Sequence, residues 1–194
     1  GAGGFVAGHA GNEFLANGAE VFATGRFARR DASLPYPWKT ADLALAGAWD
    51  ELLAWANPDA ILHLAAQSSP RDSWDSPRAT FDGNLSPVLE LVGALKRHKR
   101  PTRLLYVSSS DVYGFPSEDA LPLTEGSAPA PSNPYAVSKL AAEECLRLYA
   151  RHYKLDIVIA RPFSHSGPGQ DTRFVVPAFA REVAMVEAGL KKAL

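Results

Sequence analysis

Residues 103–114 read "RLLYVSSSDVYG", a short apolar run that ends in three serines. Leucine, tyrosine and valine in succession are typical of a strand that is buried on both faces of a sheet. Three further runs have the same character: "DAILHLAAQS" (59–68), "LDIVIARPF" (155–163) and "EVFATGR" (20–26). Helix-length segments separate these runs, which favours right-handed crossovers between parallel strands. The sequence therefore predicts an α/β fold with a Rossmann-like, doubly wound parallel sheet.

Helices are expected over 5–16, 48–56, 79–98 and 134–152. The segment 114–134 is rich in Pro, Ser and Gly and is predicted to be a long loop that leads into the last helix. A long loop in a compact domain often carries function.

The composition indicates a globular chain whose partners are small molecules. Of 194 residues, 46% are hydrophobic, and 20 basic residues nearly balance 21 acidic ones, so no basic field indicates nucleic acid. No apolar run reaches the length of a membrane span, and no signal peptide is visible. The single Cys145 cannot form an internal disulfide, which favours a cytoplasmic location.

The first seven residues, "GAGGFVA", place Gly1, Gly4 and Ala7 three apart at the head of the first expected helix. In a dinucleotide site this spacing gives a tight turn and lets the backbone approach the pyrophosphate at the helix N-terminus. A flexible glycine-rich end is the alternative. Such a turn follows a strand, so we expect the first strand of the sheet to lie outside this sequence, unless the chain starts with a loop.

The residues after the run 20–26 bear on the cofactor class. Arg26, Arg29 and Arg30 follow in this loop, and the first acid is Asp31. A carboxylate here binds the ribose hydroxyls of NAD, whereas arginine accommodates the additional phosphate of NADP. The sequence favours NADP, with NAD as the alternative.

The stretch "SNPYAVSKLAAEE" (132–144) places Tyr135 and Lys139 four residues apart, on one face of the expected helix. An ammonium near a phenol favours the phenolate and lowers its pKa from about 10 toward neutrality. The pair suits proton transfer to a small molecule. For this motif alone, a surface pair on an amphipathic helix is the alternative.

Five segments together carry a family resemblance. "GAGGFVA", "DAILHLAAQSS", "LLYVSSSDVYG", "NPYAVSK" and "ARPFSHSGPGQ", in this order, resemble the extended short-chain dehydrogenase/reductases that act on nucleotide sugars, the NAD-dependent epimerase/dehydratase family. The resemblance covers nearly the whole chain. It implies an NADP-dependent oxidoreductase with a nucleotide-sugar substrate.

Within that family, "LAAQSSPRDSW" and "RPFSHSGPGQDTRFVVPAFAREVA" are most similar to the GDP-6-deoxy-D-mannose reductases and, less closely, to the GDP-mannose 4,6-dehydratases. This similarity implies reduction of GDP-4-keto-6-deoxy-D-mannose, with dehydration or 4-epimerisation as alternatives. A non-catalytic NADP-binding or scaffold protein is an alternative of another class.

The resemblance implies specific roles for the catalytic residues. Tyr135 becomes the general acid/base, and Lys139 binds the nicotinamide ribose and lowers the pKa of the tyrosine. Ser109 hydrogen-bonds the reacting oxygen. The implied cofactor-binding residues are Gly1, Gly4, Phe5, Val6, Arg26, Asp42, Leu43, Leu64, Ala65, Ala66, Asn84, Tyr135, Lys139 and Arg161. The implied substrate-binding residues are Gln67, Ser110, Asp111, Ser164, His165, Arg173 and Val175.

Three positions depart from the family pattern. Pro87 replaces the usual glycine, and a helix is expected to start there, because proline is tolerated in the first turn of a helix. Ser164 stands where this branch usually has an asparagine, which leaves the sugar nucleotide open. Asp111 stands where the related dehydratases have a glutamate, which favours the reductase.

Other polar and aromatic residues are interpreted as structural. His63 is expected to be a packed core residue, and "KRHKR" (96–100) to be solvated surface. Trp49, Trp55 and Trp74 are expected to pack. No metal site is expected, because no Cys or His cluster has the spacing of metal ligands.

The resemblance also implies the domain organisation. Residues 1–163 are expected to form the NADP-binding domain, and 164–194 the start of a substrate-binding region that continues beyond this sequence. A homodimer is expected through the helices at 79–98 and 134–152, as in other extended family members.

Overall fold

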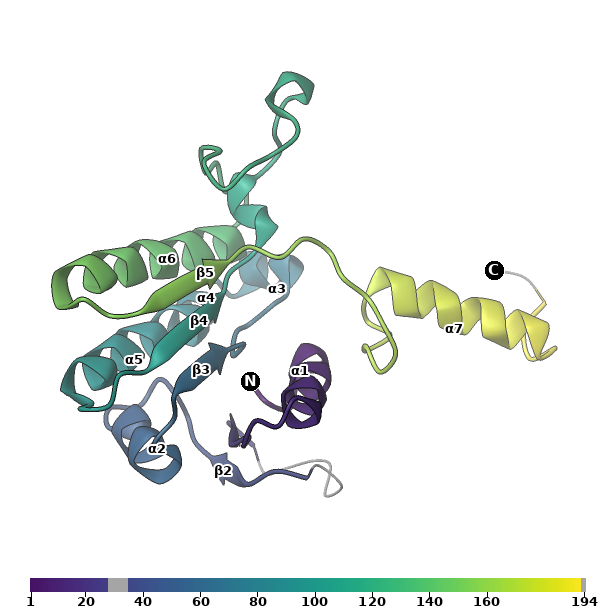
Figure 1. The fold of residues 1–194 in the computed structure, drawn as a ribbon. Coiled ribbons are helices and arrows are strands. Elements are labelled where there is room, and N and C mark those ends of the chain that lie inside the picture. Colours follow the sequence, from purple (N-terminus) through teal and green to yellow (C-terminus); the bar gives the residue numbers. More distant parts are fainter. Residues whose placement is uncertain (28–34, 193–194) are drawn as a thin grey trace. The chain divides into compact units, whose positions relative to one another are not determined.

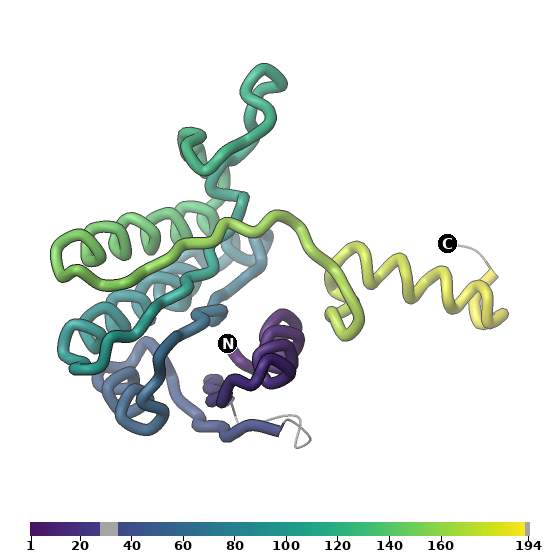
Figure 2. The backbone as a smooth tube through the Cα atoms, in the orientation of Figure 1, coloured from purple at the N-terminus to yellow at the C-terminus, as the bar shows by residue number. Residues whose placement is uncertain are grey.

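The computed structural model describes residues 1–27 and 35–192, so Arg29, Arg30 and Asp31 lie outside the described residues. The chain divides into two compact units, Gly1–Phe163 and Ser164–Leu194. Figures 1 and 2 trace both units in the colours of the sequence. Each unit is described by itself.

The first unit contains short parallel strands in two groups. β1 (Ala23–Gly25) pairs with β2 (Trp38–Thr40), and β3 (Ala60–His63), β4 (Arg103–Val107) and β5 (Ile157–Ala160) pair in the order β3-β4-β5. All these pairings are parallel. The predicted α/β fold is therefore confirmed. The strands are shorter than the apolar runs because each run continues past the carboxyl end of its strand into a loop.

The turn at the N-terminus lies between the two groups of strands. The amino group of Gly1 and the N–H of Ala2 both donate to the Thr24 carbonyl of β1, at 3.2 and 2.9 Å. On the other side, Gly1 lies so close to the chain after β3 that a Cβ atom would come within 2.6 Å of the Ala65 nitrogen. A side chain at this position would collide with backbone.

Most helices form where the sequence predicts them. α1 (Phe5–Ala16) and α2 (Ala48–Ala56) have the expected bounds, and α6 (Pro134–Tyr153) ends one residue later than expected. α2, α5 (Ser86–Arg97) and α6 lie side by side along β3–β5 (Figure 1). The remaining elements of this unit are α3 (Pro70–Asp75), α4 (Pro77–Asn84) and the short 3₁₀ helices η1 (Ser110–Tyr113) and η2 (Glu118–Ala120).

The prediction of one helix over 79–98 is wrong, because α4 ends at Asn84 and α5 begins at Ser86. Pro87 explains the break, and the expectation that a helix starts at this proline is confirmed to within one residue. Proline has no N–H for the hydrogen bond four residues back, and its ring collides with that carbonyl, so it fits only in the first turn of a new helix.

The core lies between the helical layer and the sheet. Its fully buried members include Leu91 of α5, Leu104 of β4 and Leu146 of α6. Burying a leucine contributes about 1.5–3 kcal/mol each. This packing fixes α6 against β4 and β5, the strands whose ends carry the candidate site.

His63 is a core residue, as expected. It is 3% exposed, and its ring centroid lies 5.7 Å from those of Trp49 and Tyr106. Burial, reinforced by the charge of Lys139, lowers the pKa of His63 to about 3, so its imidazole is neutral at pH 7.

The expectation that the tryptophans pack holds for Trp49, whose Nε1–H donates to the Pro87 carbonyl at 2.9 Å, and for Trp55, which packs on Phe22. It is wrong for Trp74, which is 65% exposed.

The long loop extends away from the sheet and its helices after η1 and returns to α6 (Figure 2). The Ala130 N–H donates to the Val112 carbonyl at 2.9 Å and closes the base of the loop. Asn133 then caps α6 by accepting from the Ala136 N–H at 2.8 Å. These contacts place Tyr135 in the first turn of the helix.

The second unit contains α7 (Val175–Glu187). Val175, Phe179 and Val183 lie along one side of this helix and are between 42% and 66% exposed. Throughout residues 1–27 and 35–192, every helix is too short or too polar to cross a membrane.

Candidate active site

Ser109 and Tyr135 adjoin at the carboxyl end of β4. Ser109 follows the strand, and its Oγ accepts from the Asp111 N–H at 3.1 Å, which caps η1. Tyr135 is 8% exposed, and its hydroxyl is hydrogen-bonded to Ser109. The structure thus brings together two of the three predicted catalytic residues from segments that lie 26 positions apart in the numbering.

Lys139 lies one turn further along α6 and is 3% exposed. Its Nζ donates to the Val107 carbonyl at 2.7 Å and lies 4.9 Å from the centre of the Tyr106 ring. Burial lowers the pKa of Lys139 to about 8, while the carboxylate of Glu143 opposes this shift. A buried lysine with so perturbed a pKa is typical of a functional site.

The prediction that the pKa of Tyr135 lies below its ordinary value is wrong for this structure. Burial raises the pKa of Tyr135, and the charge of Asp111 adds to this, while the hydrogen bond with Ser109 opposes it. The prediction relied on the Lys139 ammonium, which in the structure donates to the Val107 carbonyl, and burial outweighs the hydrogen bond with Ser109. At neutral pH Tyr135 therefore carries its proton.

The glycine turn has the geometry that a dinucleotide requires. Gly4 is the N-cap of α1 and has no side chain to cap it, and its N–H donates to the Gly1 carbonyl at 3.0 Å. A helix does not use its first N–H groups internally, so these can bind phosphate oxygens. Phe5 and Val6 begin this helix. The turn adjoins Ala65, at the carboxyl end of β3, where α/β sheets bind ligands.

Arg26 and Asp42 adjoin at the ends of β1 and β2. Arg26 Nε lies 3.7 Å from Asp42 Oδ2, and Asp42 Oδ1 accepts from the Ala44 N–H at 3.1 Å. Leu43, which lies between Asp42 and Ala44 in the chain, is buried. The pair is exposed enough to exchange partners with a ribose or phosphate group.

Asn84 links the loop after β3 to α6. Its Oδ1 accepts from the Gln67 N–H at 2.7 Å, and its Nδ2 donates to the Gln67 carbonyl at 3.1 Å and to Ser138 Oγ at 2.9 Å. The Gln67 side chain is bonded to the backbone of Ser69. Asn84 therefore fixes the segment that holds Leu64, Ala65 and Ala66.

Arg161 follows β5 and is turned inward. Its Nη2 lies 2.7 Å from Glu143 Oε2 and its Nε 3.0 Å from Oε1. Its guanidinium carbon lies 4.8 Å from the centre of the Tyr113 ring. The structure gives this predicted cofactor residue protein partners on two elements. Glu143 was not predicted as a site residue, although it continues the four-residue spacing of Tyr135 and Lys139.

The remaining predicted substrate residues divide between the units. Ser110 and Asp111 lie in η1, beside Ser109. Ser164, His165, Arg173 and Val175 belong to the second unit. There, the Arg173 N–H donates to Asp171 Oδ1 at 2.9 Å.

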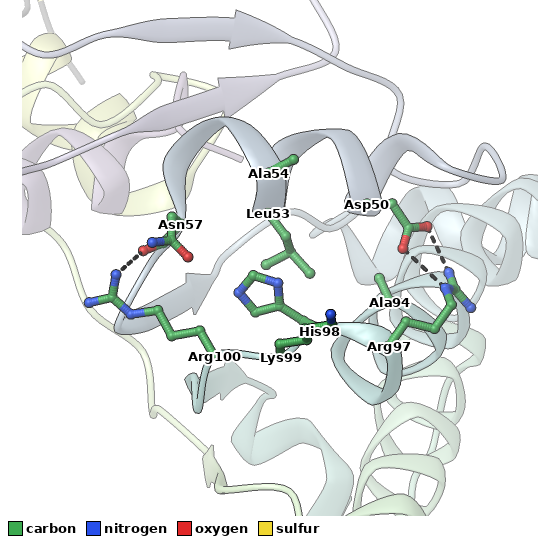
Figure 3. Close-up of a pocket in the computed structure, with 9 residues that line it drawn as sticks. All are labelled: Asp50, Leu53, Ala54, Asn57, Ala94, Arg97, His98, Lys99 and Arg100. Atoms are coloured by element: carbon green, nitrogen blue, oxygen red, sulfur yellow. Dashed lines mark hydrogen bonds and ion pairs between the residues drawn. The ribbon is translucent and has the colours of Figure 1, made fainter.

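A cavity of about 370 Å³ lies at the other end of the sheet (Figure 3). Asn57 and Arg100, which line it, precede β3 and β4 and so mark the amino ends of these strands. Arg97, at its rim, is paired with Asp50 at 2.7 Å. In "KRHKR", Lys96, Arg97 and Lys99 are exposed, as expected, and Arg97 and Arg100 have acidic partners in Asp50 and Asp59. This cavity lies at the opposite end of the strands from the serines after β4.

Within the described ranges, no three His, Cys, Asp or Glu side chains are grouped so that they could hold a metal ion.

Comparison with known proteins identifies the family. The model of the "NAD dependent epimerase/dehydratase family" matches residues 1–192. The chain belongs to this family. The resemblance of the five sequence segments is therefore confirmed.

Two curated proteins and one solved structure are similar to this chain. The chain is 41% identical over 163 residues to GDP-6-deoxy-D-mannose reductase of Pseudomonas aeruginosa, covering 82% of this chain and 52% of that protein. It is 31% identical over 158 residues to dTDP-glucose 4,6-dehydratase of Shigella flexneri, covering 73% and 44%. It also matches the structure of RMD from Pseudomonas aeruginosa complexed with NADPH, with a TM-score of 0.79 and 36% identity over 98% of this chain and 60% of that one. The chain thus spans about half the length of the curated relatives.

Proposed function

We propose that this chain is the cofactor-binding part of an NADP-dependent nucleotide-sugar oxidoreductase that reduces GDP-4-keto-6-deoxy-D-mannose. One observation carries the proposal: Ser109 and a protonated Tyr135 adjoin at the carboxyl end of the sheet. A reductase needs an acid at that place, because addition of hydride to a ketone produces an alkoxide. The similarity to the reductase and to the NADPH complex supports this choice.

Each catalytic side chain has a distinct role in this proposal. Bound NADPH supplies the hydride. Ser109 donates a hydrogen bond to the carbonyl oxygen as charge develops there, and Tyr135 delivers the proton. Lys139, whose ammonium donates to the Val107 carbonyl, would bind the ribose hydroxyls of the cofactor. The N-terminus of α1 would hold the cofactor phosphates, and Leu64, Ala65 and Ala66 would border the cofactor.

Dehydration ranks second and epimerisation third. Both begin by oxidising a sugar alcohol, for which the tyrosine must act as a base, whereas burial and Asp111 hold Tyr135 protonated. A dehydratase also needs an acid and a base at the adjacent methylene. The carboxylate of Asp111 is one methylene shorter than that of glutamate, and a misplacement of about 1 Å can cost about a hundredfold in rate. For a non-catalytic scaffold protein, a buried Lys139 beside Tyr135 serves no purpose.

Two parallel assays of the full-length protein test the reaction. One receives GDP-mannose alone, and the other the 4-keto-6-deoxy sugar nucleotide with NADPH. We expect NADPH oxidation in the second assay and no consumption of GDP-mannose in the first. Consumption of GDP-mannose without added reductant, with no NADPH oxidation in the second assay, would reverse the ranking. Because Ser164 departs from the family pattern, the corresponding UDP and dTDP sugars belong in the same series.

Replacing Arg26 with alanine tests the cofactor class. If Arg26 binds the 2′-phosphate, the variant should lose roughly tenfold or more in affinity for NADPH and little for NADH, because a charge-assisted hydrogen bond contributes about 1.5–3 kcal/mol. Tryptophan fluorescence titration measures both dissociation constants. Lys39→Ala, which removes a neighbouring charge that is paired with Glu51, is the control. Equal affinities for NADPH and NADH in the wild type would contradict the assignment.

We also propose a cytoplasmic homodimer that pairs α5 and α6 with their copies. Leu89 of α5, and Val137 and Leu148 of α6, are 43%, 41% and 56% exposed. Val137 and Leu148 lie three turns apart on one helix face. Light scattering should show a dimer at micromolar concentration, and Leu148→Glu should weaken it at least about tenfold, a change of 1.4 kcal/mol. Leu45→Glu, at an equally exposed leucine in a loop, is the control. A wild-type monomer at these concentrations would contradict the proposal.

A further inference from the structure

The catalytic helix carries a buried charge that the proposed mechanism does not use. Tyr135, Lys139 and Glu143 follow one another at four-residue intervals, so they lie on one face of α6. The Glu143 side chain is 0% exposed. It is paired with two arginines, Arg161 at 2.7 Å and Arg147 at 2.9 Å. Burial raises the pKa of Glu143, but Arg161 and Arg147 outweigh this and hold the pKa below its ordinary value. Glu143 is therefore ionised at neutral pH.

Arg161 connects three elements at the carboxyl end of the sheet. It follows β5, forms a two-pronged pair with Glu143 of α6, and stacks on Tyr113 of η1. Its side chain is 10% exposed. Beside it, the Ser110 N–H donates to the Pro162 carbonyl at 3.0 Å, which ties η1 to the same segment. η1 carries Ser109 at its cap, so the position of Ser109 relative to Tyr135 depends on these contacts.

The charge of Glu143 also acts on Lys139. Lys139 is surrounded by His63 of β3, by Tyr106 of β4 and, on α6, by Glu143 and by Tyr135 one turn before it. Arg161, which follows β5, is paired with Glu143. His63 is neutral, and burial raises the pKa of both tyrosines. Glu143 is thus the anion among them. Without the Glu143 carboxylate, the buried guanidinium of Arg161 would have no acidic partner to balance its charge, and Lys139 would lose the negative charge that favours its ammonium form.

We propose that Glu143 and Arg161 are positioning residues, which together hold Ser109 and Tyr135 in register, while the Glu143 carboxylate stabilises the ammonium of Lys139. This inference rests on the proposed function. In this inference Arg161 acts through its contacts with Glu143 and Tyr113 and fixes the position of η1 relative to α6.

Two Glu143 variants separate the two roles. Glu143→Gln keeps the shape and an oxygen acceptor for Arg161 but removes the charge. In the full-length protein, the pH at which NADPH affinity and kcat/KM for NADPH fall should move down by about one unit, because the Glu143 carboxylate raises the pKa of Lys139 and a nearby opposite charge shifts a pKa by about one unit or more. Glu143→Asp keeps the charge but shortens the side chain. Its pH limit should stay near that of the wild type, while kcat falls about tenfold or more.

The neighbouring Glu144→Gln is a matched control, since Glu144 is 61% exposed and pairs only at the surface with Arg147. It should change neither the pH limit nor kcat. Arg161→Lys keeps the charge and breaks the two-pronged pair, and should lower kcat about tenfold with an unchanged pH limit. If Glu143→Gln does not fold, the kcat values of Glu143→Asp and Arg161→Lys test the positioning role.

Two failures are distinguishable. A pH limit for NADPH binding that is the same in Glu143→Gln and wild type, or a normal kcat in both Glu143→Asp and Arg161→Lys, would overturn this inference alone. A wild type that does not bind NADPH would overturn the proposed function and this inference with it.

Discussion

Replacing Tyr135 with phenylalanine should lower turnover about 10²- to 10⁴-fold, the range expected when a general acid is removed, and leave NADPH affinity nearly unchanged. The phenylalanine ring fills the same buried space, so packing in the first turn of α6 is retained. The variant loses the hydroxyl that is hydrogen-bonded to Ser109 and its proton. Single-turnover oxidation of NADPH, followed by its absorbance, measures the chemical step without product release.

Tyr153→Phe provides the matched control for this experiment. Tyr153 ends the same helix, is 37% exposed and packs against Lys96 and Tyr149. Its loss of a hydroxyl should leave the rate within about twofold, as for surface substitutions away from a site. Turnover near the wild-type value in Tyr135→Phe would remove Tyr135 from the mechanism, and a loss of NADPH binding would show that the tyrosine is structural.

Local signals sufficed for much of the fold. The bounds of α1 and α2 follow from periodicity and from Gly4 and Asn57 at their ends, and the apolar runs identify the strands because buried parallel strands are apolar on both faces. Pro87 predicts the start of α5, but the expected span 79–98 joined α4 and α5, because two adjacent helices and one long helix present nearly the same apolar pattern.

The electrostatics of the site could not be predicted in the same way. The spacing of Tyr135 and Lys139 places them on one helix face, but the direction of the Lys139 ammonium depends on the carbonyl of Val107, which lies 32 residues away. The pairing of Glu143 with Arg161 likewise joins α6 to β5. Both contacts exist only after the sheet and helices have packed. Sequence spacing therefore identified which residues gather at the site, and tertiary packing decided their protonation.

Lys139→Met should abolish most activity and yet stabilise the protein. The methionine keeps the apolar stem in the buried position but removes the ammonium that binds the ribose. kcat/KM for NADPH at pH 7 should fall about a hundredfold or more, because both binding and positioning suffer. The wild type should lose kcat/KM as the pH rises through about 8, where the free enzyme's Lys139 becomes neutral. The variant should lack this alkaline limb, having no ammonium to titrate.

The stability effect has the opposite sign, because burial disfavours the charged lysine. Folding lowers the pKa of Lys139 from 10.5 to about 8. Between pH 8 and 10.5 the lysine is therefore protonated in the unfolded chain and neutral in the folded protein, so the stability of the wild type rises with pH across that window. At pH 7 the buried ammonium of Lys139 lowers the free energy of unfolding by its full amount, up to roughly 3 kcal/mol at 1.36 kcal/mol per unit of pKa. Lys139→Met should therefore unfold at higher denaturant than wild type at pH 7, and this advantage should shrink toward pH 10. Lys96→Met, at an exposed lysine of α5 that stacks on Tyr153, should change neither activity nor the pH dependence of stability. A Lys139→Met variant that is both less stable and still active would show that Lys139 belongs to the scaffold; a more stable and inactive variant would mean that the fold holds a costly buried charge because the site requires it.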